Sequence, residues 1–332
     1  MTGLLLAALL QVQSSPFLTA LNANFDAWDS NRDGTLSRTE VDHAVVDPRF
    51  EKQAAGALAV LKQVQRGKEQ VKTITKTELP AFATKYDKRF KGNMSRIRQA
   101  SEQIFEKGQP NINSIRQGRI GDCFFLAPIG CVAHKFPDRL KSMVTPLPDR
   151  KVKLKFAKQE VVVDLPTDTE IALSSTTEGN GIWINVFEKA FGEILGDKKG
   201  SNSKSSTDAI ARGGSSKPVL ALLTGKEVKT IARGETESLF KIAERAGRKE
   251  VFAVMSTNDE VKIPGVSPNH AYSVLGVEGG KVVMWNPHGQ TFTPKGPEGV
   301  KFGYVVRNGI FRVSKEDTKE WFGRVVWADL GS

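Results

Sequence analysis

The segment from Gln117 to Cys123 constrains this chain most, because it combines a helix start with a reactive side chain. It reads Gln-Gly-Arg-Ile-Gly-Asp-Cys and leads into the apolar run 124–127. The run predicts a buried helix, and Asp122 is a favourable N-cap, so Cys123 should lie in the first turn. The positive end of the helix dipole favours a thiolate there, and Gln117 can donate its carboxamide N–H to an oxyanion. The residues alone leave open a buried structural cysteine beside an ordinary loop glutamine.

A nucleophilic cysteine needs a base, and the sequence offers four histidines: His43, His134, His270 and His288. His270 begins an alternating segment rich in β-forming residues, 270–277, which predicts a strand. A second strand is expected over 281–286, ending at Asn286. A strand histidine is often only a packed residue, so the order of Cys, His and Asn along the chain is the stronger indication.

The turn between these two strands decides whether Asn286 can reach His270. A two-residue loop at 279–280 would place Asn286 on the other face, opposite Ser273. We expect a three-residue loop with a glycine in the left-handed bulge position. That register places Asn286 opposite Tyr272 and diagonal to His270, where its carboxamide fixes the orientation and tautomer of the imidazole.

These motifs resemble those of the calpain-type branch of the papain-like cysteine proteases. The matching segments are Gln-Gly-x-x-Gly-Asp-Cys, His-Ala-Tyr-Ser-Val and Asn-Pro-x-Gly, at 117–123, 270–274 and 286–289. Supporting stretches lie at 182–191, 222–225 and 309–317, so the resemblance covers roughly residues 110–330. It implies an α+β fold with a papain-like core, in which a helical half carries the cysteine and a β-rich half carries the histidine and asparagine.

The resemblance also implies a role for each matched residue. Cys123 would be the nucleophile, His270 the base and acid, Asn286 the orienting residue and Gln117 the oxyanion donor. The implied reaction is hydrolysis of peptide bonds in proteins or peptides through a thioester intermediate.

Three residues depart from a simple match. Phe124 and His288 stand where the family usually has tryptophan. We expect His288 to lie opposite His270. There an imidazole shields the His–Asn hydrogen bond from water less than a tryptophan would, and when protonated it disfavours a positive charge on His270. Pro128 removes the helical bond to the Phe124 carbonyl, which predicts a kink or a local 3-10 turn.

A second motif lies near the N-terminus, where residues 29–40 fit the twelve-residue loop of an EF-hand, with Gly34 at the sharp turn. The expected ligands of one Ca²⁺ ion are side-chain oxygens, one carbonyl and one water-mediated contact: Asp29, Asn31, Asp33, Thr35 (carbonyl), Ser37 (water) and Glu40. Ser37 and Glu40 also form a capping box for the exit helix. The alternative is an acidic turn without a metal.

EF-hands occur in pairs, and residues 73–78 repeat the second half of the first loop, including a capping box from Thr75 to Glu78. The ligand half fails, because the positions that should begin the loop hold Gly67, Glu69 and Val71. We therefore predict a second loop that binds no metal and supports the first through a short β-contact between Leu36 and Ile74.

The 332 residues are long for one core and suggest two domains. We expect a signal peptide or N-terminal helix at 1–15, an EF-hand pair at 16–90, a linker at 91–110 and a calpain-like protease domain at 111–332. Residues 196–218 are expected to form a mobile surface loop. The sequence leaves two locations open, cytoplasmic or exported through a weak N-terminal signal, and predicts no transmembrane segment.

The net charge is +11, but lysines and arginines are dispersed and no aromatic residues alternate with them. We therefore expect no nucleic-acid partner, and at most a weak attraction to anionic surfaces. The two cysteines, Cys123 and Cys131, are too far apart on one helix for a disulfide, and Cys131 is expected in the core.

Three functions fit these observations. The first is a calcium-associated cysteine endopeptidase. The second is a calcium-binding interaction protein on a catalytically weak papain-like scaffold, suggested by His288. The third is a transglutaminase-like acyltransferase, against which Asn286 counts because an aspartate is usual at that position. Oligomeric state has no signal in the sequence.

Overall fold

A computed structural model describes residues 15–67, 71–106, 108–199 and 206–331. The expected signal peptide or helix at 1–15 thus lies outside the described residues except for Ser15. The Ser15 hydroxyl accepts the Leu18 N–H at 3.1 Å and caps the first described helix.

Four helices and two short strands form the N-terminal module, residues 15–99. The helices are α2 (Pro16–Trp28), α3 (Arg38–Val45), α4 (Lys52–Arg66) and α5 (Leu79–Gln99), with a 3-10 turn, η1 (Lys76–Glu78), before α5. Strands β1 (Thr35–Ser37) and β2 (Thr73–Thr75) pair antiparallel with Leu36 opposite Ile74, which confirms the predicted contact. Both predicted capping boxes are present, at Ser37 and at Thr75.

Helix α5 extends through the first part of the expected linker, 91–110. Its residues Phe90 and Met94 are buried against α4 at Gly56. A Cβ on Gly56 would lie 2.6 Å from the Met94 sulfur, so glycine allows the two helices to approach closely. The connection is therefore helical up to Gln99 because it contributes to the core of the N-terminal module.

The middle of the chain is mainly helical and carries a small antiparallel sheet. The helices are η2 (Ile112–Ser114), α6 (Cys123–Lys135), α7 (Pro137–Ser142), α8 (Asp168–Leu173), α9 (Trp183–Lys199), α10 (Thr207–Ile210) and α11 (Ser216–Thr224). The sheet has the order β3 (Val144–Leu147), β4 (Lys151–Lys155), β5 (Glu160–Asp164). The prediction of one loop over 196–218 is wrong, since α9 ends and α11 begins within it and Ile210 of α10 is fully buried.

The C-terminal part forms a six-stranded antiparallel sheet in the order β10-β9-β8-β7-β11-β6. Its elements are β6 (Val228–Ala232), α12 (Thr236–Gly247), β7 (Val251–Ser256), β8 (Ala271–Glu278), β9 (Lys281–Trp285), β10 (Ile310–Ser314), α13 (Thr318–Trp321) and β11 (Arg324–Asp329). Successive residues of β7 alternate between two cores: Phe252 and Val254 pack with α6, whereas Ala253 and Met255 pack with α12. The sheet is therefore buried on both faces.

The β8–β9 hairpin differs from the predicted turn but keeps the predicted register near its far end. Glu278 pairs with Lys281, so the loop has two residues, both glycines with positive φ, and the three-residue loop is wrong. The extra residue lies instead in a β-bulge at Leu275. Beyond the bulge Ser273 pairs with Trp285. The next position, Asn286, therefore lies opposite Tyr272, as predicted.

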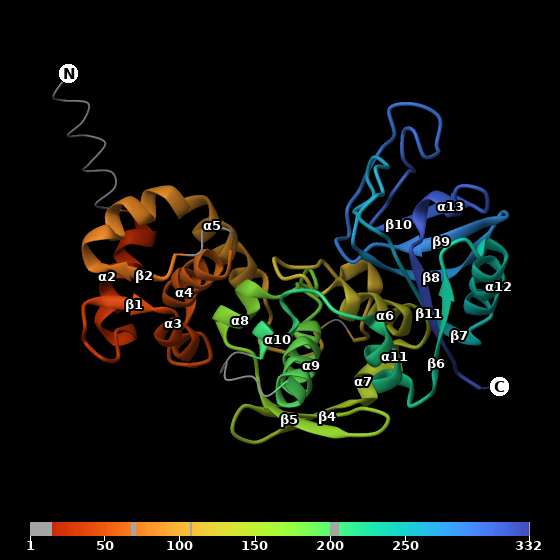
Figure 1. Cartoon of the computed structure of the whole chain (residues 1–332). Helices are drawn as coiled ribbons and strands as arrows, with labels where there is room; N and C mark the ends of the chain where they lie inside the picture. Colours follow the sequence, from red (N-terminus) through yellow and green to blue (C-terminus); the bar gives the residue numbers. More distant parts are fainter. Residues whose placement is uncertain (1–14, 68–70, 107, 200–205, 332) are drawn as a thin grey trace.

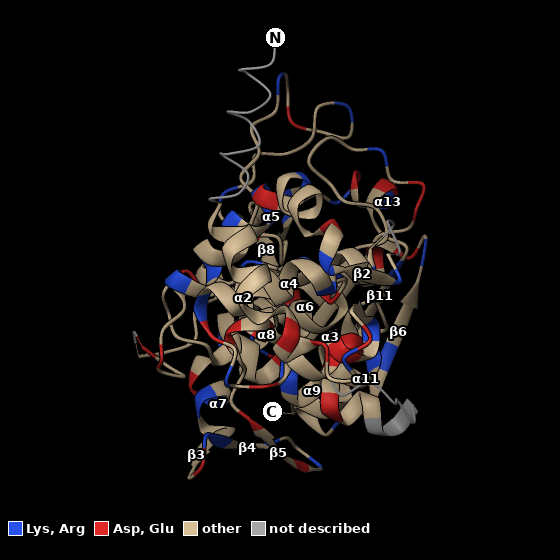
Figure 2. Cartoon of the chain, turned by 90° about the vertical axis from the view of Figure 1, so that its left-hand side faces the viewer, with Lys and Arg blue, Asp and Glu red and all other residues tan. Residues whose placement is uncertain are grey.

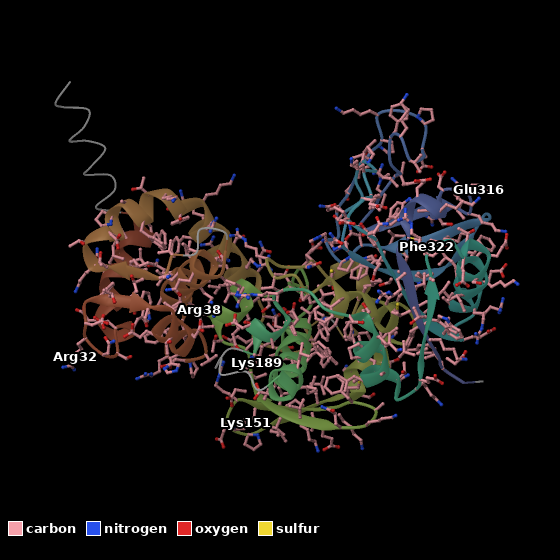
Figure 3. All side chains as sticks on the ribbon, in the orientation of Figure 1. Arg32, Arg38, Lys151, Lys189, Glu316 and Phe322 are labelled. Carbon is pink, nitrogen blue, oxygen red and sulfur yellow. The ribbon has the colours of Figure 1, made fainter. Side chains whose placement is uncertain are left out.

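The N-terminal module lies at one end of the molecule and the six-stranded sheet at the other, with α8, α9 and the three-stranded sheet between them (Figure 1). Between the two ends, Lys189 of α9 donates to Glu170 of α8 at 2.7 Å, and both side chains are buried (Figure 3). Basic and acidic residues are interspersed over the elements seen in Figure 2, in agreement with the dispersed charge of the sequence. None of the helices in the described ranges is both long and apolar enough to cross a membrane.

A buried ion-pair network joins the N-terminal module to the remainder of the chain. Lys62 of α4 is fully buried and donates to Asp42 of α3 and, at 2.6 Å, to Asp208 of α10. Arg66 of α4 also donates to Asp208. The last residues of α8, 172–173, belong to the apolar core of the module. Charge pairing and apolar packing therefore fix the module against the rest of the chain.

We expect Lys62→Met to lower the free energy of unfolding by about 3 kcal/mol, because it removes the cation shared by two largely buried carboxylates. Lys151→Met is the matched control, because Lys151 forms an exposed ion pair with Asp164 on the three-stranded sheet (Figure 3). Its substitution should lower the free energy of unfolding by less than about 1 kcal/mol. Urea denaturation followed by circular dichroism measures both. Equal losses in the two variants would contradict the role of the network.

Candidate active site

Cys123 is the first residue of α6 and is half-buried, as the sequence predicts. The helix start differs from the expectation in one respect: the Asp122 side chain makes no capping hydrogen bond. It is fully buried and lies beside the carboxyl of Glu188 on α9. Burial of a charged carboxylate without water or hydrogen-bond donors is costly, so this environment favours the neutral carboxyl.

The Asp122–Glu188 pair is a buried acid pair next to the nucleophile position. Burial raises the pKa of Asp122 well above its usual value, and the nearby Glu188 carboxyl raises it further. Burial also raises the pKa of Glu188, although the Ser175 backbone N–H donates to it at 3.1 Å. Two carboxyls in such contact favour sharing one proton. The pair thus anchors α9 to the segment that precedes Cys123.

His270 and Asn286 lie together, as the sequence predicts. The His270 Nε2 and Asn286 Oδ1 are 2.8 Å apart, and both side chains are buried. Asn286 Oδ1 also accepts the His288 backbone N–H at 3.0 Å, which identifies this atom as the amide oxygen. An acceptor at this position requires a proton on Nε2 and leaves Nδ1 of His270 as the basic nitrogen.

The backbone of His270 is fixed by the end of β7, although the residue itself precedes β8. Its N–H donates to the Thr257 hydroxyl at 2.9 Å, and its carbonyl accepts the Thr257 N–H at 2.9 Å. The His288 ring stacks on the His270 ring with 4.5 Å between centroids and 5° between planes. His288 therefore covers the imidazole as we expected.

Both titrating groups of the site favour their neutral forms in this structure. Burial lowers the pKa of His270 to about 3, with a smaller contribution from the charge of His288 and an opposing one from the Asn286 hydrogen bond. Burial raises the pKa of the Cys123 thiol, against hydrogen bonds from backbone N–H groups that include Ala271. The backbone N–H groups of Cys123 and Phe124 at the helix start lower this pKa as expected, but desolvation outweighs them and the net shift is upward.

Cys123 and His270 face one cleft of about 400 Å³. Cys123 comes from α6 and His270 from the sheet, so the cleft lies between the two halves of the core. No hydrogen bond joins the thiol to the imidazole among the interactions of the described residues. The cleft is lined largely by small polar residues outside the predicted motifs, including Ser215, Ser216 and Asn258.

Gln117 lies in the loop before Cys123 but is not part of the cleft lining. Its side-chain Nε2 donates to the Ile120 carbonyl at 3.0 Å, and its Oε1 is buried without a partner. The backbone N–H of Gln117 donates to the Pro287 carbonyl at 2.8 Å, which ties this loop to the residue after Asn286. One of the two amide hydrogens of Nε2 therefore holds the loop.

Ser216 is a residue of the cleft that the sequence analysis missed. Its hydroxyl donates at 2.8 Å to the Phe124 carbonyl, the group that Pro128 leaves without a helical partner. Helix α6 continues as an α-helix from Cys123 to Lys135, so of the two expected effects of Pro128, a kink or a 3-10 turn, the 3-10 turn is absent from it. Pro128 indicates that a carbonyl needs a donor, but nothing in the sequence shows that the donor lies 92 residues away.

The residues that the sequence predicts as an EF-hand loop, 29–40, lie between α2 and α3 and bond to one another. Asp29 accepts the backbone N–H groups of Asp33 and Gly34 at 3.1 and 2.9 Å. Glu40 accepts the Asn31 N–H across the loop at 3.3 Å and the Ser37 N–H at 2.9 Å. These bonds occupy oxygens that a Ca²⁺ ion would take, and within the described residues no three His, Cys, Asp or Glu side chains converge as a metal site.

The donor set nevertheless fits Ca²⁺ chemically. It combines carboxylate, amide and carbonyl oxygens, which hard cations prefer. Gly34 has φ +80° with open space around it, as the sharp turn of such a loop requires. Binding through both oxygens would require Glu40 to release Oε2 from its bonds to Ser37, while Oε1 already faces the loop.

The remaining histidines and the second cysteine lie elsewhere. His43 is exposed on α3, and His134 lies in the last turn of α6. Cys131 is 2% exposed, and its thiol donates to the Ala253 carbonyl at 3.2 Å. Both cysteines are free, and Cys131 is a core residue as predicted.

The buried His270 predicts a specific pH dependence of stability. Unfolded His270 takes up a proton near pH 6.5, whereas folded His270 does so only near pH 3. Its contribution is therefore fully present above pH 6.5 and is lost as the pH falls toward 3. We expect His270→Gln to flatten the decline in the free energy of unfolding between pH 7 and 4, and exposed His43→Gln to leave it unchanged. Parallel curves for wild type and His270→Gln would contradict the buried neutral imidazole.

Comparisons with known proteins identify the family of this chain. The model of the calpain family cysteine proteases matches residues 87–297, which is more than half of the chain. A curated relative, the calpain-type cysteine protease ADL1 of Oryza sativa subsp. japonica, is 21% identical over 247 residues, covering 66% of this chain. The chain covers 11% of the length of that relative. The matched region contains the cysteine, histidine and asparagine motifs, and the chain belongs to the calpain family of cysteine proteases.

Proposed function

We propose that this chain is a calcium-associated cysteine endopeptidase that acts through Cys123, His270 and Asn286. The observation that carries the proposal is the 2.8 Å contact between His270 Nε2 and Asn286 Oδ1, because His270 lines the same cleft as Cys123. This contact leaves the basic Nδ1 of His270 to accept a thiol proton. Membership of the calpain family supports protein or peptide substrates.

In the proposed reaction, the Cys123 sulfur attacks the peptide carbonyl carbon while its proton passes to Nδ1 of His270. The backbone N–H of Cys123, at the start of α6, and the second amide hydrogen of Gln117 stabilise the oxyanion. His270 then gives the proton to the leaving amine, and a thioester forms. Water, activated by the same imidazole, hydrolyses the thioester.

His270 carries a positive charge during this cycle, and its surroundings oppose that charge. Burial and the stacked His288 lower its pKa, while Asn286 acts in the other direction. Catalysis therefore depends on the oxyanion donors and the bound substrate to favour the charged intermediate states.

The calcium association rests on the first loop of the N-terminal module. The residues that would hold one Ca²⁺ ion are those predicted from the sequence: Asp29, Asn31, Asp33, Thr35, Ser37 and Glu40. A bound ion would supply a fixed charge that orders the loop between α2 and α3. The second loop is proposed to bind none, and its Glu69 lies outside the described residues. We further propose that the EF-hand pair, residues 16–90, precedes the protease domain, 111–332.

A second candidate is a calcium-binding interaction protein on the same scaffold. The neutral pair of thiol and imidazole, together with His288 in the stack, favours it. The acyltransferase alternative has no such support, since the orienting group is the amide of Asn286.

Casein hydrolysis across a Ca²⁺ titration tests the proposal. We expect activity in wild type, its loss in Cys123→Ala, and a shift to higher Ca²⁺ concentration in Glu40→Gln, because the loop loses a carboxylate ligand. Cys131→Ala is the matched control for removal of a thiol and should retain activity. Activity that is indifferent to chelator would leave a protease without calcium regulation. Absence of hydrolysis at every Ca²⁺ concentration would favour the interaction protein.

A further inference from the structure

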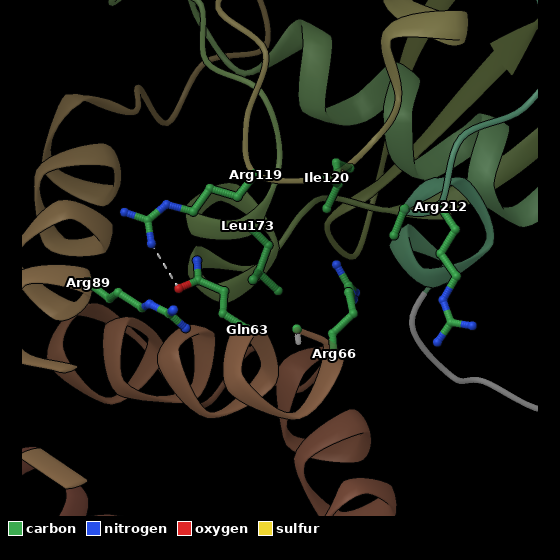
Figure 4. A pocket seen from close by; sticks show the side chains of 9 residues that line it. Gln63, Arg66, Arg89, Arg119, Ile120, Leu173 and Arg212 are labelled. Atoms are coloured by element: carbon green, nitrogen blue, oxygen red, sulfur yellow. Dashed lines mark hydrogen bonds between the residues drawn. The ribbon is translucent and has the colours of Figure 1, made fainter. Parts of the chain in front are cut away.

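A cavity of about 500 Å³ lies between the N-terminal module and the loop before Cys123, separate from the catalytic cleft. Its walls come from α4, α5, the end of α8, the segment before Cys123 and the segment after α10 (Figure 4). Four of its nine lining residues are arginines, and no acidic residue is among the nine: Gln63, Arg66, Gly67, Arg89, Arg119, Ile120, Leu173, Ala211 and Arg212. We call this cavity the arginine pocket.

The guanidinium groups surround the pocket from separate parts of the chain. Figure 4 shows Arg89 and Arg119 at one end and Arg66 and Arg212 at the other. Arg119 Nη1 donates at 3.1 Å to the neutral side chain of Gln63, and Arg66 donates to Asp208 outside the lining. The lining itself thus brings four guanidinium groups to one cavity and contributes no carboxylate to it.

The positive charges also act on one another. Desolvation and then the charge of Arg89 lower the pKa of Arg119. Arg96, behind the same loop, has its pKa lowered by burial and in part by Arg119. Arg89 and Arg119 thus repel each other at one end of the cavity, and an anion that enters it would relieve this repulsion.

The chemistry of the lining defines the class of ligand. Arginine offers a planar fork of donors that matches phosphate oxygens in a bidentate manner. The volume is in the range of small-molecule sites, and Ile120, Leu173 and Ala211 add an apolar wall that strengthens charge interactions. We propose that the arginine pocket binds a small polyanion with two or more phosphate groups, either free or as the headgroup of a lipid.

The position of the pocket connects such a ligand to the catalytic loop. Arg119 and Ile120 lie four and three residues before Cys123. The Gly121 N–H donates to the Ala211 carbonyl at 2.8 Å, so the wall beyond α10 is bonded to the same loop. A ligand held by arginines of both the module and this loop would brace the loop against the module. The binding itself does not depend on the proposed catalytic role.

Calorimetric titration of the full chain with inorganic tripolyphosphate tests the pocket directly. The protein is kept free of Ca²⁺, because tripolyphosphate chelates it, and the ionic strength is held constant. We expect one-to-one binding that Arg119→Gln and Arg212→Gln each weaken about tenfold, since each removes one charged fork. Arg233→Gln removes the same charge from an exposed pair with Glu260 and should leave the affinity unchanged.

Arg212 is exposed, so its substitution should not unfold the chain, and circular dichroism spectra check this for every variant. Equal affinity in wild type and both pocket variants, equal weakening by Arg233→Gln, or no saturable binding would each overturn the proposal.

Sedimentation with phosphatidylcholine vesicles that contain a bisphosphorylated inositol lipid distinguishes the two sources. Sedimentation that Arg212→Gln abolishes and Arg233→Gln does not would support the pocket with a lipid headgroup as ligand. Tripolyphosphate binding without sedimentation would support the pocket with a free polyphosphate. Sedimentation that both variants reduce equally would reflect the general basic surface and contradict the pocket as a headgroup site.

Discussion

The close packing of α6 on the β8–β9 hairpin is the contact on which the rest of the site depends. A Cβ on Gly130 would lie 2.5 Å from the Trp285 ring, so only glycine allows the helix this near the sheet. The Ser273 hydroxyl donates to the Ala127 carbonyl at 2.7 Å across the same contact. Because α6 begins at Cys123 and β9 ends next to Asn286, this packing sets the separation between Cys123 and its proposed partners.

The same packing determines the electrostatics of the site. By excluding water it strengthens the hydrogen bond between His270 and Asn286, yet it also favours the neutral forms of the thiol and imidazole. The Asp122–Glu188 pair is a further result of burial, since both carboxyls are fully enclosed behind the nucleophile. The site is thus poorly solvated, so the charges of the proposed reaction would have to be stabilised by the oxyanion donors and the bound substrate.

Local patterns in the sequence predicted the features that depend on neighbouring residues. The helix start at Cys123, the capping box at Ser37 and the Leu36–Ile74 pair follow from residue type and spacing. The position of Asn286 was predicted correctly from the wrong turn, because a bulge at Leu275 restores the register that a two-residue loop would otherwise shift.

Features that join distant segments could not be predicted in this way. The carboxyl of Glu188 beside Asp122, the Ser216 hydroxyl on the Phe124 carbonyl and the four arginines of the pocket depend on tertiary packing.

Covalent labelling is the most direct test of the claim that Cys123 is a nucleophile served by His270. Full chain with Ca²⁺ is treated with a peptidyl epoxysuccinate, and the adducts are located by peptide mass mapping. We expect one adduct, at Cys123, forming much more slowly in His270→Ala, with Cys131 unmodified. Labelling of Cys123 at the same rate in wild type and His270→Ala, or labelling of both cysteines alike, would contradict the proposed site.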